Sequence, residues 1–269
     1  MYLPLYQLDL HSAAALNSVD YTTRVTEYLR NPQTSRNSHF VPVHAVYQRQ
    51  GGGARLILPW PKCTLRELWK TSKPRDPFLD KSDILWMLEE CRGMAAGLSE
   101  IDDYIIANNS AGFQYVGICP ENIFLYPCSK AQLDDIRGNL AIATFVPTPF
   151  LRWSRETFTP LRHFKIADWS YRPPESYLPP ETIFLEPKLP PCDVWPYGCV
   201  LLEFVTWCLG GWALLEEFRR CREPGGEFFE LVRVEEEHQE EPAPIYARVK
   251  RSVYEVIPTL YSLGLHVSR

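Results

Sequence analysis

The sequence has 269 residues, of which 45% are hydrophobic, and these values predict a folded protein of one large domain or two lobes. The formal net charge of −5 argues against the broad basic face that non-specific nucleic-acid binding requires, so we expect no nucleic-acid partner. None of the eight cysteines has a partner at C-x-x-C spacing, which argues against zinc and for reduced thiols. The opening residues, MYLPLYQLDL, contain no Lys or Arg, so we expect no secretory signal and an intracellular location, cytoplasmic or nuclear.

The first 60 residues carry mostly strand signals. Residues 1–20 show no clear period, although Leu5–Leu10 is strand-like. We expect strands at Val41–Gln48 and Arg55–Leu58, and a short helix at Tyr21–Arg30. The glycines at 51–53 lie between the last two strands and indicate a hairpin. Because the proline in Trp60-Pro61 interrupts regular structure, we place a boundary there, between a domain at 1–60 and a second at 61–269.

The next part of the chain carries helical signals. Residues 64–69, TLRELW, predict a helix, and a polar loop containing prolines follows at 71–81. Ser82 is expected to cap a long helix. The apolar residues that give this helix its periodicity are Ile84, Leu85, Leu88, Cys91, Met94, Ala95 and Leu98. After it we expect a loop at 104–114 and two strands, Ile123–Tyr126 and His163–Ala167, joined by a long connection through 128–162.

The most apolar stretch of the chain is 194–215, which is long enough to span a bilayer. Glu203 and the Gly210-Gly211 pair interrupt it, and a helix that is apolar all round is also typical of a buried core helix. We favour a buried helix that begins near Cys192 and therefore expect no membrane partner; a membrane anchor is the alternative. For the rest of the chain we expect a solvated loop at 222–245 and a last helix at Tyr246–Leu263.

Several segments resemble, in order, the motifs of the eukaryotic protein-kinase family, particularly its fungal-type members. The segments are LILPWPKCTLRELW, LEECRGMAAGLSEI, ICPENIFLY, FKIADWS, YRPPE and CDVWPYGCVLLEFVTWCLGG. They resemble, respectively, the hinge region, the helix before the catalytic loop, the catalytic loop, the D-F-G strand, the A-P-E segment and the central helix of the large lobe. The resemblance implies an α+β, two-lobed kinase-like fold. Its small β lobe would be truncated at 1–60, and its mainly helical large lobe at 61–269 would be incomplete at the C-terminal end.

The resemblance implies that the catalytic chemistry is lost. The position of the catalytic aspartate holds Gly117, and that of the phosphate-binding lysine holds Cys119, which we expect to be a packed thiol. No glycine-rich loop and no lysine of the third strand precede them. Two magnesium-ligand positions match the family, Asn122 and Asp168. Weak binding of ATP and Mg²⁺ is compatible with these two residues, and we expect that the protein requires neither.

The hinge-like and activation-like segments also depart from the family pattern. If Leu58 is the gatekeeper, Pro61 stands where a backbone N–H would bind adenine, and proline has no such donor. We expect Trp60, with Trp169, to fill part of the cleft. The segment after Asp168 is short if it ends at the P-P-E of 173–175 and slightly longer if it ends at that of 179–181. In the family, the position of Asp193 ties the buried helix to the catalytic loop.

Three functional hypotheses follow. The first is a pseudokinase that lacks phosphotransfer and acts by interaction with other proteins. The second is an active ATP-dependent serine/threonine kinase with displaced residues, in which Glu121 would serve as the base and Lys165 as the cation. The third is a membrane-anchored protein that uses 194–215. We favour the first, because a positioned base and a phosphate-binding cation are both missing from their usual places.

Overall fold

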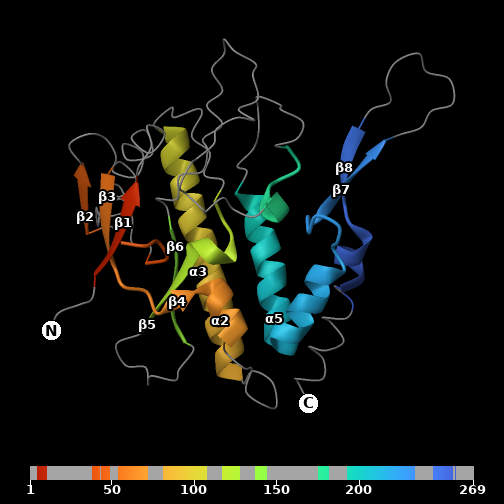
Figure 1. Ribbon diagram of the computed structural model, residues 1–269, viewed down its shortest axis with the longest axis horizontal. Helices are drawn as coiled ribbons and strands as arrows, with labels where there is room; N and C mark the ends of the chain where they lie inside the picture. The colour runs from red at the N-terminus through yellow and green to blue at the C-terminus, as the bar shows by residue number, and fades with distance from the viewer. Residues whose placement is uncertain are drawn as a thin grey trace, which may run out of the picture.

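The computed structural model describes residues 5–10, 38–42, 44–48, 54–71, 81–107, 117–127, 137–143, 175–181, 193–233, 245–256 and 258. These residues form an α+β structure with three small sheets and long helices between them. In Figure 1 a β-sheet lies at one side, the long helices occupy the centre, and a two-stranded ribbon lies at the opposite side. The predicted helix at 21–30 and the predicted strand at 163–167 lie outside the described residues.

The first sheet contains β1 (Leu5–Leu10), β2 (Ala45–Gln48) and β3 (Ala54–Pro59), in the order β1-β3-β2. Both neighbours of β3 are antiparallel to it, and Gln48 lies opposite Ala54 across the predicted glycine turn. The strand predicted at Arg55–Leu58 is therefore confirmed, whereas the one predicted at Val41–Gln48 begins only at Ala45, and β1 coincides with the strand-like stretch Leu5–Leu10. Strands β2 and β3 were predictable because apolar and β-branched residues alternate over short runs on both sides of a glycine cluster.

The second sheet joins segments that are distant in the chain. Its strands are β4 (Cys63–Thr64), β5 (Ile123–Pro127) and β6 (Gly138–Ile142), in the order β4-β5-β6. Strand β5 is confirmed, but β6 interrupts the connection that we expected through 128–162, so that expectation is wrong there. The run GNLAI is short and largely buried, and such a run lacks the alternation that identifies a half-exposed strand. Phe40 forms a parallel bridge to Ile142 at the outer edge of β6.

Three helices form the body of the molecule: α2 (Leu65–Thr71), α3 (Lys81–Ala107) and α5 (Val194–Arg220). Each was predicted, although α3 continues four residues into the loop expected at 104–114, ending at Ala107. Ser82 lies inside α3 instead of preceding it, and its hydroxyl accepts a hydrogen bond from Arg137 at 2.9 Å. The cap predicted at this position is therefore wrong.

The buried face of α3 differs from the predicted one at three positions. Ala95 is exposed, and Leu85 and Leu88 are 49% and 54% exposed, whereas Trp86 and Met87 are buried. The indole of Trp86 donates a hydrogen bond to the Gly138 carbonyl at 2.7 Å, so this contact turns the tryptophan toward β6. Spacing alone could not distinguish these neighbouring faces, because apolar residues occur on both.

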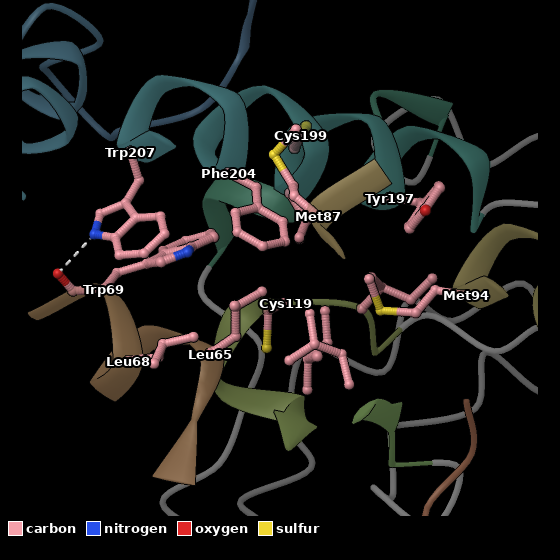
Figure 2. Packing of buried hydrophobic residues seen from close by; sticks show 14 of the residues in the cluster. Leu65, Leu68, Trp69, Met87, Met94, Cys119, Tyr197, Cys199, Phe204 and Trp207 are labelled. Carbon is pink, nitrogen blue, oxygen red and sulfur yellow. Dashed lines mark hydrogen bonds between the residues drawn. The ribbon is translucent and has the colours of Figure 1, made fainter. Parts of the chain in front are cut away.

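The core lies where α2, α3 and α5 meet the second sheet. Leu65, Trp69, Phe204 and Trp207 are fully buried and come from two helices that lie far apart in the chain. The Trp207 indole donates to the Trp69 carbonyl at 3.0 Å, as Figure 2 shows. Tilted and edge-on ring contacts link Phe204 to both tryptophans and to Trp86. These contacts fix α5 against α2 and α3.

Helix α5 contains the apolar stretch that sequence analysis identified as a buried helix or a membrane span. Among the described residues it is the one helix long and apolar enough to cross a bilayer. Half of its most apolar 18-residue stretch is buried inside the protein. The helix is kinked at Gly211, whose φ of 66° is in a region that residues with a side chain rarely adopt. The predicted interruption by glycine is thus a bend within one helical element.

The C-terminal part differs most from expectation. Strands β7 (Phe229–Arg233) and β8 (Ile245–Val249) form an antiparallel ribbon, where we expected a loop and the start of a helix. Both runs contain aromatic and β-branched residues, a strand composition that the acidic stretch beside them obscured. Helical structure begins at 251 and is described to 256. The predicted helix therefore starts five residues later than expected.

Candidate functional site

The loop that resembles a kinase catalytic loop folds around Asn122. It leads into a single 3-10 turn, η1 (Pro120–Asn122), which the proline at its first position favours. The Asn122 amide nitrogen donates to the Gly117 carbonyl at 2.6 Å, and its backbone N–H donates to the Cys119 carbonyl at 2.9 Å. Asn122 is 2% exposed, and its own carbonyl accepts a hydrogen bond from Ala143. The asparagine therefore closes the loop and ties it to the end of β6.

Cys119 is a buried thiol in this loop. Its side chain is fully buried, and burial raises the pKa of the thiol well above its ordinary value, with a smaller contribution from Glu121. A thiol reacts through its thiolate, which this environment disfavours. The geometry agrees with the expectation of a packed thiol and offers neither a nucleophile nor a cation at this position.

Glu121 points from the same turn into a buried network of charges. Its Oε1 accepts a hydrogen bond from Nε of Arg66 on α2 at 2.9 Å. The same arginine donates through Nη2 to the Tyr177 hydroxyl, and its Nη1 lies 3.3 Å from Oε2 of Glu203 on α5. Tyr177 lies in a second 3-10 turn, η2 (Glu175–Tyr177), and donates to Glu203 Oε2. Four segments that are distant in sequence are thus joined through one guanidinium and one carboxylate.

A second arginine completes the network. Arg222 donates through Nη2 to Oε1 of Glu203 at 2.6 Å. Its guanidinium carbon lies 4.2 Å from the ring centroid of Phe218 and 4.0 Å from that of Phe228. Glu203 is fully buried, and Arg222 is 2% exposed. A carboxylate with no access to water needs this many donors, because an unpaired buried charge would be very costly.

The charge state of the network follows from its geometry. Burial alone would lower the pKa of the Arg66 guanidinium, but Tyr177, Glu203 and Glu121 together raise it above its ordinary value. Burial and the nearby Glu203 carboxylate raise the pKa of Tyr177. The arginine therefore remains charged and the tyrosine remains neutral throughout the physiological range, so that Arg66 forms an ion pair with Glu203 and Tyr177 donates a hydrogen bond to it.

The predicted hinge residues take different positions. Leu58 is buried in β3, opposite Tyr6 of β1. Trp60 is 55% exposed, so the prediction that it fills a cleft is wrong. Pro59 and Pro61 flank it, and the N–H of the next residue, Lys62, donates to the Leu125 carbonyl of β5 at 2.8 Å. These backbone constraints hold the junction between the two sheets while the indole faces solvent.

Three residues of the predicted site lie outside the described residues: Lys165, Asp168 and Trp169. A metal site made by Asn122 and Asp168 thus stays a prediction. Asp193 itself is 4% exposed at the start of α5. Among the described residues, no group of three or more His, Cys, Asp or Glu side chains could hold a metal ion.

Sequence reasoning found the loop at 117–122 but missed the network beside it. One signal was available: Glu203 interrupts an otherwise apolar helix, and a buried carboxylate requires cationic partners. Local spacing does not identify those partners, because Arg66 lies far before Glu203 in the sequence and Arg222 lies after it, beyond the end of α5.

No family model matches this sequence, and no curated protein matches it. The family resemblance therefore depends on the motifs themselves.

Proposed function

We propose that the chain is a protein-kinase-like domain that lacks phosphotransfer and acts by interaction with other proteins. The observation that carries this proposal is the loop at 117–122. A glycine occupies the position of the catalytic base, and a fully buried thiol, Cys119, occupies that of the phosphate-binding lysine. Phosphotransfer depends on positioned charge, and neither residue supplies any.

The order of the elements supports the kinase-like part of the proposal. A small antiparallel sheet precedes the junction at Trp60, and helices α2 and α3 follow. The asparagine-closed loop then leads into β5, and the long buried helix α5 comes later. This is the order that the matched motifs imply for a small lobe, a hinge and a helical large lobe.

Exposed apolar side chains support the interaction part of the proposal. Leu231, Ile245 and Tyr246 of the β7–β8 ribbon are 43–46% exposed, and Tyr254 in the helical turn after it is 57% exposed. The ribbon lies at the side of the molecule opposite β1–β3 (Figure 1). Exposed aromatic and branched side chains that gather on one element are typical of surfaces that contact other proteins.

The geometry disfavours the active-kinase alternative. Its replacement base would be Glu121, but Arg66 already holds the Glu121 carboxylate at 2.9 Å. If the carboxylate accepted a substrate proton it would lose its charge, and the Arg66 guanidinium, which is 6% exposed, would have one anionic partner fewer. Breaking a buried pair in this way costs about 3–5 kcal/mol.

A nucleotide thermal-shift titration tests the proposal. An active kinase at 1 mM ATP and Mg²⁺ would be near 100 times its dissociation constant, which stabilises the fold by about 2.7 kcal/mol and raises Tm by about 5 °C or more. We expect a shift below about 1 °C, both with Mg²⁺ and with EDTA. A magnesium-dependent shift of several degrees that Asp168→Ala abolishes would instead support the active alternative.

A further inference from the structure

A histidine and a glutamate meet at the point where the first sheet joins the helical body. His39 precedes β2 by a few residues, and Glu90 lies on α3. The His39 Nδ1 lies 2.9 Å from the Leu140 carbonyl and 3.4 Å from Oε2 of Glu90. The same Oε2 accepts the Leu140 N–H at 2.6 Å. Both backbone groups of one β6 residue are thus bound by two titratable side chains.

The contact is closely packed. The side chains of His39 and Glu90 are 14% and 12% exposed. A Cβ atom on Gly93 would lie 1.9 Å from His39 Nε2, so the imidazole rests directly against the α3 backbone at this glycine. Because a carbonyl can only accept, His39 Nδ1 carries a proton and donates it to Leu140. The ring has little freedom to leave this position without opening the contact.

The same contact fastens the segment at 38–42 to the rest of the molecule. Val41 donates its N–H to the Ile142 carbonyl at 3.0 Å, and Ile142 donates its own to the His39 carbonyl at 2.8 Å. Two residues after this segment, the His44 N–H bonds Ile57 of β3 at 2.8 Å. Residues 38–42 therefore connect β6 of the body to the three-stranded sheet.

We propose that His39, Glu90 and the Leu140 backbone form a proton-controlled latch between residues 38–42 and the α3–β6 body. The latch holds when Glu90 carries a proton and loosens when Glu90 is ionised. It controls how firmly the three-stranded sheet is attached to the helices. This role is independent of phosphotransfer and of the kinase-like proposal.

The electrostatics of the contact determine whether it tightens or loosens as the pH rises. Burial raises the pKa of the Glu90 carboxyl to about 7, the Leu140 N–H opposes this, and Glu89 adds to it. Among the described residues, the other titratable groups that face it are Cys91 on α3 and His39 on the facing segment. Strand β6 carries no titratable side chain, and Arg137 beside it is bonded to Ser82.

The pH window follows from linkage. In the open state Glu90 meets water, and its pKa returns to its ordinary value of 4.5. Between pH 4.5 and about 7 the closed state keeps a proton that the open state has released. The opening constant therefore rises by up to about tenfold per pH unit across this window and becomes constant above it. The stabilisation of the closed state by the Glu90 proton is complete below pH 4.5 and is lost as the pH rises through about 7.

Amide hydrogen exchange tests the latch. We expect the protection factor of peptides covering 137–143, corrected for the intrinsic exchange rate, to fall by about tenfold or more between pH 5 and pH 7. Peptides from α5 serve as the internal control and should show a much smaller change. A flat protection factor at 137–143, or an equal fall in α5, would overturn the proposal without any variant.

Two substitutions test whether Glu90 is the group whose proton controls the contact. Glu90→Gln keeps an acceptor for Leu140 but cannot ionise, so its protection at 137–143 should not change between pH 5 and pH 7. Glu89→Gln is the matched control, because Glu89 is exposed and adjacent, and this variant should keep the pH dependence. If Glu90→Gln retains the wild-type dependence, another group controls the contact and the proposal is wrong.

Discussion

The charge at Glu203 is the feature of this fold whose removal should be most costly. Glu203→Gln keeps the size of the side chain but removes the anion that faces Arg66 and Arg222. The carboxylate is fully buried, and both arginines are less than one-tenth exposed. Breaking a buried ion pair costs about 3–5 kcal/mol, a large fraction of the 5–15 kcal/mol that stabilises an average domain.

Urea denaturation measures this cost, with Glu216→Gln as the matched control. Glu216 lies on the same helix and pairs with Arg219 at 2.7 Å, but that pair is on the surface, so its loss should cost about 0.5 kcal/mol or less. In the double variant Glu203→Gln/Arg222→Gln, the two costs should not add, because the partners share one interaction. A cost below about 1 kcal/mol for Glu203→Gln would refute the buried network.

Two further changes test local features of the structure. Gly93→Ala should destabilise the protein by about 1–3 kcal/mol in thermal melts, because the new methyl group must displace the His39 ring. In a His39→Ala background this cost should largely disappear. Equal costs in both backgrounds would contradict the contact between Gly93 and His39. In native protein, iodoacetamide should label the exposed Cys221 well before the buried Cys119, as followed by peptide mass mapping; equal labelling rates would show that the thiol at 119 is accessible.

Short-range patterns predicted much of this fold. Local periodicity and turn chemistry predict the strands on either side of the glycines at 51–53, the helix after Trp60 and the apolar helix from 194. Local patterns failed where a neighbouring signal was stronger. The acidic run after β7 concealed the strands on both sides of it.

The candidate site was only partly predictable. Gly117, Cys119 and Asn122 are close in sequence, so a motif could place them in one turn. The network around Glu203 could not be found in this way, because its partners are brought together by tertiary packing. Trp60 could not be placed from the sequence either, because an apolar residue between two sheets can be buried or exposed. Here the backbone on either side of Trp60 is fixed, while its indole is exposed.

The most direct test of the central claim is transfer of the γ-phosphate of ATP, measured with labelled nucleotide at millimolar ATP and Mg²⁺ on a generic protein substrate and on the chain itself. Asp168→Ala serves as the control for contaminating kinases. We predict equal, background incorporation for the wild type and the variant, because the loop at 117–122 provides neither a base nor a phosphate-binding cation. Incorporation above background that Asp168→Ala abolishes would contradict the account.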